Sequence, residues 1–222
     1  MNIILLLFII LATMFVSSSV NNILNVTTAL DNYFEMADVP DYFVTTMNKN
    51  LTVDPDETLS AASALERYSS EKVLFLAPEN FICENEDITI PGGTNLVHSD
   101  ICLNYFLSDG RTLETVENGE FYMTEGKADN LGVEVGDKLT IELNGVSREF
   151  VFAGKIKDAL FGSNQMNFTR YIISEADFNS FLSVENTDEY YGATLVYIYS
   201  SDLETVLPQI KSLVDNSILT MD

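Results

Sequence analysis

The residues able to carry out chemistry are few in this 222-residue chain. It contains one histidine, His98, and two cysteines, Cys83 and Cys102. A serine nucleophile needs a histidine base beside it, and the chain has no G-x-S-x-G turn to present such a serine. The G-x-x-x-x-G-K-[S/T] loop that cradles nucleotide phosphates is also absent from the sequence. We therefore expect no catalytic residue and no nucleotide-binding site, and we interpret His98 as an exposed or locally bonded residue of a loop.

Acidic residues are the most abundant candidates for cation binding or acid–base chemistry. They occur in three close groups, which are Asp54 with Asp56 and Glu57, Glu84 with Glu86 and Asp87, and Asp188 with Glu189. Calcium prefers such oxygen ligands, but the D-x-[DN]-x-[DN]-G loop of a calcium hand is missing. With 34 acidic residues in the chain, close groups arise by chance. We expect a solvated acidic surface with no metal ion and no cofactor.

The two cysteines leave two alternatives open. A Cys83–Cys102 disulfide would stabilise the fold by about 3 kcal/mol in the chain-entropy estimate. Both cysteines lie in apolar runs, FIC and ICL, so two free and buried thiols are equally compatible with the sequence. The spacing of two cysteines and one histidine does not match a zinc finger.

The charge of the chain excludes one class of partner. There are 34 acidic and 11 basic residues, which gives a formal net charge of −23. Such a protein repels the phosphates of nucleic acids and the headgroups of anionic lipids. We expect no nucleic-acid partner.

The N-terminus decides the compartment. Residues 3–16 read IILLLFIILATMFV, and with the following serines the apolar stretch approaches the ~20 residues of a membrane span. A retained transmembrane helix is our first interpretation; a cleaved signal peptide and a buried core helix are the alternatives. Because no lysine or arginine precedes Lys49, neither a signal peptide nor a cytoplasmic flank is marked by basic residues. The first two interpretations place the chain after about residue 20 outside the cytoplasm.

The helical pattern continues beyond the membrane span. Apolar residues recur at intervals of three and four, and asparagines fill the opposite face, without a glycine or proline before Pro40. Either the same helix extends as a stalk through Val20–Phe34, adding about 20 Å at 1.5 Å per residue, or this segment is the first helix of the domain. A continuous helix of this kind can carry motion across the membrane surface.

The rest of the chain alternates strand and helix patterns. Strands are predicted at 41–47, 72–76, 81–83, 88–90, 101–106, 119–123, 138–143, 146–156, 170–173, 193–199 and 218–221. Helices are predicted over 56–68, after the Ser174 cap, and from 201 to 214, where Pro208 should kink the helix or shift its start. Asn144-Gly145 is the strongest hairpin signal. We predict an α+β fold in which residues 40–78 and 168–222 form one layer of strand–helix–strand units and residues 79–167 form an inserted β subdomain.

The order of three segments resembles a known family. MADVPDYFV at 36–44 follows the apolar helix, LGVEVGDKLTI at 131–141 lies in the β region, and RYIISEADF at 170–178 leads back into the α+β layer. Together they resemble the extracytoplasmic domain of FtsX/MacB-type ABC transporter permeases, over nearly the whole chain. The resemblance implies a ferredoxin-like, porter-type layer with a sabre-like insert, behind a transmembrane and stalk helix at 1–38.

The resemblance also implies a mechanism and partners. ATP is bound by a separate cytoplasmic ABC ATPase, and a second permease copy completes the assembly in the membrane. Closure of the ATPase moves the stalks and the extracytoplasmic domains, which is called mechanotransmission. A full permease has a basic cytoplasmic lead and further membrane helices that this sequence lacks, and the substrate is not implied. The alternative functions are a membrane-anchored or secreted ligand-binding module and an acidic exported hydrolase, which would need convergent carboxylates in a cleft.

Overall fold

The structure of the chain is a computed structural model that describes residues 3–49, 54–92, 94–98, 102–163, 165, 168–182, 191–215 and 217–221. The chain divides into two compact units, Met1–Val39 and Pro40–Asp222. We describe each unit separately.

The first unit is a single long helix, α1, which spans Ile3–Met36. By length and composition α1 can cross a membrane, and it is the one helix among the described residues for which this holds. The helix ends in a Schellman motif, because Val39 N–H donates to Phe34 O at 3.1 Å and Asp38 N–H donates to Glu35 O at 3.2 Å. Asp38 takes the left-handed conformation, with φ of 55°, that this motif requires.

The second unit is built on one mixed sheet. Its order is β11-β1-β10-β2-β4-β9-β6-β8-β7-β3, and β5 pairs with β8. The strands are β1 (Tyr42–Lys49), β2 (Arg67–Leu76), β3 (Phe81–Cys83), β4 (Thr94–His98), β5 (Phe106–Leu107), β6 (Glu120–Thr124), β7 (Lys138–Leu143), β8 (Val146–Lys157), β9 (Phe168–Ile173), β10 (Tyr191–Tyr199) and β11 (Ser217–Met221). The β4–β9 and β6–β8 pairs are parallel and the other pairs are antiparallel. The predicted α+β class is confirmed.

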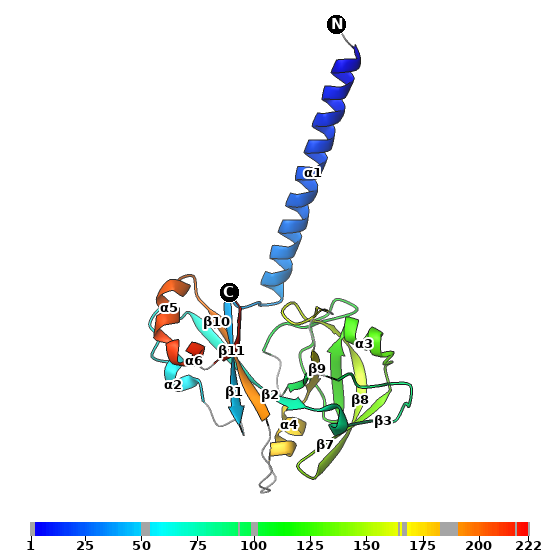
Figure 1. The fold of residues 1–222 in the computed structure, drawn as a ribbon, viewed down its shortest axis with the longest axis vertical. Coiled ribbons are helices and arrows are strands. Elements are labelled where there is room, and N and C mark those ends of the chain that lie inside the picture. Colours follow the sequence, from blue (N-terminus) through cyan, green and yellow to red (C-terminus); the bar gives the residue numbers. More distant parts are fainter. Residues whose placement is uncertain are drawn as a thin grey trace. The chain divides into compact units, whose positions relative to one another are not determined.

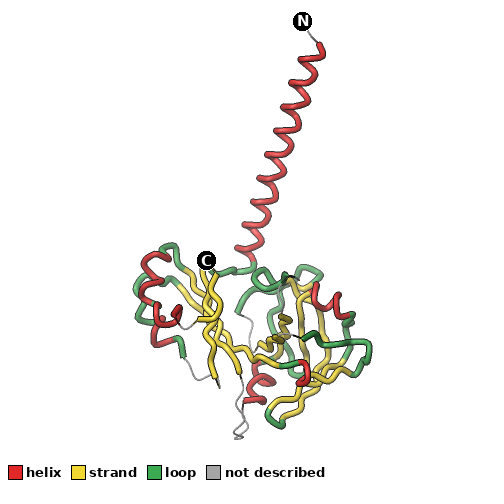
Figure 2. The backbone as a smooth tube through the Cα atoms, in the orientation of Figure 1, coloured by secondary structure: helices red, strands yellow, loops and turns green. Residues whose placement is uncertain are grey.

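The sheet curls, so that its strands form two groups (Figures 1 and 2). We call β11, β1, β10 and β2 the β1 half, and β9, β6, β8, β7, β3 and β5 the β8 half; β4 lies between them. The helices α2 (Asp56–Leu59), α5 (Leu203–Gln209) and α6 (Lys211–Asp215) accompany the β1 half, and η1 (Pro78–Asn80), α3 (Glu125–Leu131) and α4 (Glu175–Leu182) accompany the β8 half.

Three apolar clusters form the core. The first joins β1 and β10 to the helices of the β1 half, where Val44 and Val196 meet Leu59 and Val206. The second fills the β8 half, with Phe150 and Phe152 against Phe178 and Phe181 of α4. The third lies between the halves and includes Phe43, Tyr197 and Phe161. Apolar contact therefore continues from one half into the other.

Several local predictions are confirmed. β7 and β8 form the expected hairpin, and Asn144 and Gly145 at its turn have φ of 53° and 76°, as a type I′ turn requires. Ser174 caps α4, because its Oγ accepts a hydrogen bond from Asp177 N–H at 3.1 Å. These signals depend on only a few neighbouring residues.

The helix predicted over 56–68 is wrong beyond its first turn. α2 ends at Leu59, and Arg67 already begins β2. Residues 67–74 pair with β10, so sheet pairing overrides the helix propensity at the end of the predicted helix, and residues 60–66 connect α2 to β2 as turn and coil.

Three strand and loop predictions near residue 100 are also corrected. Ile88–Ile90 is coil, although the Ile88 side chain is buried. Of the strand predicted at 101–106, only Phe106 lies in a strand, which is β5, and residue 101 lies outside the described residues. His98, expected in a loop, is the last residue of β4.

The helix predicted from 201 to 214 begins at Leu203 and breaks at Ile210, which separates α5 from α6. Pro208 has no N–H for the helical ladder, and the break follows two residues later. The predicted subdomain boundaries at 40–78 with 168–222 and at 79–167 stay predictions.

Candidate functional site

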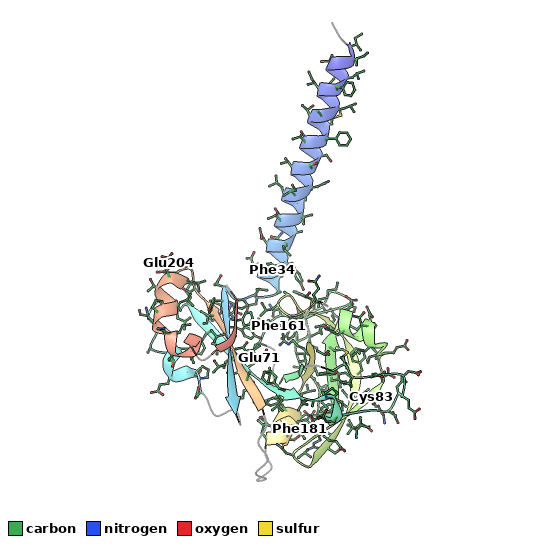
Figure 3. The ribbon with its side chains drawn as sticks, in the orientation of Figure 1. Phe34, Glu71, Cys83, Phe161, Phe181 and Glu204 are labelled. Atoms are coloured by element: carbon green, nitrogen blue, oxygen red, sulfur yellow. The ribbon has the colours of Figure 1, made fainter. Side chains whose placement is uncertain are left out.

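Five buried polar side chains meet where the two halves of the sheet come together, and we call them the Arg170 cluster. They are Arg170 on β9, Glu71 on β2, Tyr197 on β10, Asp158 just after β8 and Tyr105 just before β5. All five are buried, and the side chain of Arg170 is 1 % exposed. Figure 3 labels Glu71 and, beside it, Phe161, between the strands of the two halves.

The Arg170 guanidinium is the centre of the cluster. Its Nη1 donates to Asp158 Oδ2 at 2.7 Å. Its Nη2 donates to Glu71 Oε1 and to the Tyr105 hydroxyl, each at 2.8 Å. These charge-assisted hydrogen bonds join three segments that are far apart in the sequence.

The carboxylates have further partners that fix them in place. Glu71 Oε1 also accepts a hydrogen bond from the Tyr197 hydroxyl at 2.5 Å. Asp158 Oδ1 accepts the backbone N–H groups of Leu160 and Phe161, each at 2.9 Å, and so closes the turn after β8. The centroid of the Phe161 ring lies 4.6 Å from the guanidinium carbon of Arg170, within the range of a cation–π interaction.

The surroundings keep the groups in one charge state. Burial by itself lowers the pKa of Arg170, but the nearby Tyr105 phenol and the two carboxylates outweigh it and raise that pKa well above its ordinary value. Burial raises the pKa of Tyr105 and of Tyr197 well above that of a free phenol, and Glu71 adds to this effect. The guanidinium stays charged and the two phenols stay neutral at ordinary pH.

The cluster has the properties of a structural joint. Its groups are buried among apolar side chains, so no substrate reaches them in this conformation. Removing one partner from a buried ion pair typically costs about 3–5 kcal/mol, because the other charge stays buried without compensation. Hydrogen bonds are directional, so this joint fixes the relative positions of β2, β9, β10 and two connecting segments.

The cysteines do not form the disulfide that we considered. Both are free. Cys83 packs against the apolar cluster of the β8 half, whereas Cys102 packs against the cluster between the halves and its thiol lies 3.4 Å from Ser70 O. Burial raises the pKa of the Cys83 thiol, which keeps it protonated and less reactive.

The acidic groups do not converge on a cation site among the residues that the structure describes. Asp54 Oδ1 instead accepts the N–H of Asp56 at 3.0 Å in a local turn. Glu84, Glu86 and Asp87 lie at the surface in the segment after β3. Asp188 and Glu189 lie outside the described residues.

A small cavity lies within the β8 half. Tyr171 lines it together with Cys83, Ile88, Phe121 and Met123. Its volume is about 10 Å³, which is room for a single water molecule. The buried Tyr171 hydroxyl has no hydrogen-bond partner among the described residues, and burial raises the pKa of this phenol.

The stalk part of α1 exposes an apolar seam that one threonine interrupts. Its positions follow a 3-4-3-4 spacing, and they are Val20, Ile23, the polar Thr27, Leu30 and Phe34. Ile23 is 65 % exposed, and the side chains stand away from the helix in Figure 3. This heptad spacing is typical of a helix that packs against another helix.

Sequence reasoning missed the Arg170 cluster. Arg170 and Glu71 both lie at or beside predicted strands, and a charged residue among buried strand residues is a signal that it needs a partner. The partner itself is not readable, because Arg170 and Glu71 are 99 positions apart.

The comparisons with known proteins add a likeness of fold only. No family model matches the chain, and no curated protein matches it. Among solved structures, it is similar to a domain of a Porphyromonas gingivalis protein provisionally described as a permease, with 14 % identity, a TM-score of 0.43, and coverage of 81 % of this chain and 87 % of that one. It is also similar to a Bacillus anthracis protein provisionally described as a lipoprotein, with 8 % identity, a TM-score of 0.39, and coverage of 81 % of this chain and 96 % of that one. Likenesses at this level carry no argument about function.

Proposed function

We propose that the Pro40–Asp222 unit is the extracytoplasmic domain of an FtsX/MacB-type ABC transporter permease, and that α1 is its first transmembrane helix and stalk. In this proposal residues 40–78 and 168–222 correspond to the ferredoxin-like, porter-type layer, and residues 79–167 correspond to the sabre-like part. The chain has no enzymatic activity of its own, and ATP is hydrolysed by a separate cytoplasmic ABC ATPase.

One observation carries the proposal: the second unit starts and ends on two neighbouring strands of its sheet. β1 and its antiparallel neighbour β11 are in a register that places Phe43 opposite Met221. A domain inserted between two membrane helices has to leave and re-enter the same membrane surface, so its ends must be close together. This geometry, together with an apolar helix directly before β1, fits such an insertion.

The connection from α1 to the sheet suits mechanotransmission. β1 follows shortly after α1 and is paired on both sides, with β10 over its whole length and with β11. The Asp41 carboxylate accepts the N–H of Ser200 at 2.9 Å, which fastens the start of β1 to the end of β10. A displacement of the stalk end is therefore delivered to an interior strand of the sheet.

The apolar seam of α1 supports the proposed partners. Large apolar side chains on the stalk, such as Ile23, Leu30 and Phe34, are exposed. Outside a membrane, such a seam is covered by another helix, and a second permease copy supplies one. The membrane-spanning part is covered by lipid.

Sidedness is tested by cysteine labelling in intact cells. Glu204→Cys on α5 and, separately, Asn2→Cys directly before the apolar run are made in a Cys83→Ala/Cys102→Ala background. A membrane-impermeant maleimide should label Glu204→Cys without lysis and Asn2→Cys only after lysis. Labelling of Glu204→Cys only after lysis would contradict the extracytoplasmic placement.

The transporter role is tested at the gene and in the membrane. The reading frame beyond codon 222 should encode further membrane helices beside an ABC ATPase gene, and the tagged permease should co-purify with that ATPase. If the frame stands alone and no ATPase co-purifies, the anchored ligand-binding module replaces the permease.

A further inference from the structure

We propose that the Arg170 cluster is a clamp that makes the β1 half and the β8 half move as one body. For the source of the motion this inference rests on the proposed function. The clamp itself is a property of the isolated chain and is tested without a transporter.

The backbone connection between the halves is narrow. Among the described residues, β2 pairs with β4 along Val73–Leu76, and β4 pairs with β9 along Thr94–His98. The β1–β10 pair, by contrast, runs over the whole of β1. A sheet joined by so short a pairing can flex at that point unless side chains hold it.

The side chains of the cluster span this narrow connection directly. Glu71 and Tyr197 come from the β1 half, whereas Arg170 and Asp158 come from the β8 half. The Arg170 guanidinium reaches Glu71 across the position of β4, and the same guanidinium holds Asp158. One planar group with fixed donor directions thus links both halves.

Apolar contact alone does not set this geometry. Phe43 of β1 meets Phe161 of the segment after β8, with ring centroids 5.3 Å apart. Hydrophobic contact is non-directional, so apolar side chains can slide past one another and stay in contact. A planar guanidinium between two carboxylates keeps its hydrogen bonds only within a narrow range of positions. The apolar cluster holds the halves together, and the Arg170 cluster selects one arrangement of them.

The experiment measures the distance between the halves. Spin labels are placed at Glu204→Cys in α5 and Val135→Cys in the turn before β7, both exposed, in the full chain in detergent micelles with Cys83→Ala and Cys102→Ala. Pulsed electron resonance then gives the distribution of distances. The clamped chain should show a single population, with any other arrangement below about 1 %.

The key variant is Arg170→Met/Glu71→Gln/Asp158→Asn. It removes all three charges together, so no buried charge is left without compensation. The new amide oxygen at position 71 can still accept from the Tyr197 hydroxyl, and the one at position 158 can still close the turn after β8. We expect a second distance population of about 10 % or more, and a calorimetric unfolding enthalpy above the van't Hoff value because the halves unfold separately.

A matched control removes an exposed ion pair within one half. Lys138 Nζ lies 3.0 Å from Glu149 Oε1 between β7 and β8, and Lys138→Met/Glu149→Gln should leave both the single distance population and the single unfolding transition unchanged. If the triple variant behaves like this control, the clamp does not exist. If the triple variant does not fold, Arg170→Lys decides: it keeps the charge but loses the fork, and an unchanged single population in that variant overturns the proposal.

Discussion

Two buried tyrosines, Tyr197 and Tyr171, can each be replaced by phenylalanine, and we expect the two replacements to change the free energy of unfolding in opposite directions. Tyr197 donates to the Glu71 carboxylate at 2.5 Å, and both residues are buried. A hydrogen bond to a charged group contributes about 1.5–3 kcal/mol. Tyr197→Phe should therefore lower the free energy of unfolding by about 2 kcal/mol, the lower part of that range, because Glu71 Oε1 keeps its bond to Arg170.

Tyr171→Phe removes a buried hydroxyl that has no partner among the described residues. A buried, unsatisfied hydroxyl costs about 1–3 kcal/mol, so its removal should raise the free energy of unfolding by about 1 kcal/mol. The ring contacts of Tyr171 with Phe81, 5.0 Å between centroids, are kept in the variant.

The assay is thermal unfolding of the full chain in detergent, followed by circular dichroism. For a chain of this size, 1 kcal/mol shifts the midpoint by about 2–4 °C, so Tyr197→Phe should unfold about 4–8 °C lower and Tyr171→Phe about 2–4 °C higher than the wild type. Equal midpoints for Tyr197→Phe and the wild type would refute the account of the cluster. A loss of stability in Tyr171→Phe would show that its hydroxyl has a partner.

Three further predictions concern pH and the backbone. Because the pKa values of the buried tyrosines are raised, the folded state keeps phenol protons that the unfolded state loses above about pH 10. The free energy of unfolding should therefore be unaffected by these groups below that pH and fall above it by about 1.4 kcal/mol per pH unit for each phenol. Urea titrations at pH 8–12 should show a shallower fall for Tyr197→Phe than for the wild type. A Cβ at Gly162 would lie 2.2 Å from Asp158 O, so Gly162→Ala should lower the free energy of unfolding in urea by about 1–3 kcal/mol. At Gly92 a Cβ would meet open space, so Gly92→Ala should lower it by less than about 0.5 kcal/mol. Equal losses of stability in the two variants would refute the close approach at Gly162. Asp38→Gly removes a non-glycine residue from a left-handed helix cap and should slow amide exchange in the last turn of α1 by about fivefold, equivalent to about 1 kcal/mol; unchanged exchange would contradict strain at this cap.

The sequence predicted those elements whose signals are local. The β7–β8 hairpin follows from Asn144-Gly145, where two adjacent residues supply the positive φ values of the turn. The α4 cap follows from Ser174 and the residues directly after it. The apolar run at the N-terminus likewise predicted α1 without any other part of the chain.

The rest could not be predicted because it depends on distant residues. Tyr197 and Glu71 are 126 positions apart, and no periodicity in either segment indicates that they meet. The order of the strands in the sheet brings the two residues together. The same order places Arg67 at the start of β2, where the sequence predicted the end of a helix. The same non-local pairing is why a buried arginine cluster was found only in the structure.

The pairing of β1 with β10 also sets an order of assembly during synthesis. β1 is made early, but its register partners lie at 191–198, so the strand waits for nearly the whole chain. The strands β6 to β9 with α3 and α4 lie within 120–182 and can pair as soon as they emerge. Contacts of such long sequence separation form slowly, and an unpaired strand is prone to aggregation while it waits. We expect the β8 half to fold first and the β1 half to close last, which makes the nascent β1 segment the point at which synthesis of this protein is most vulnerable.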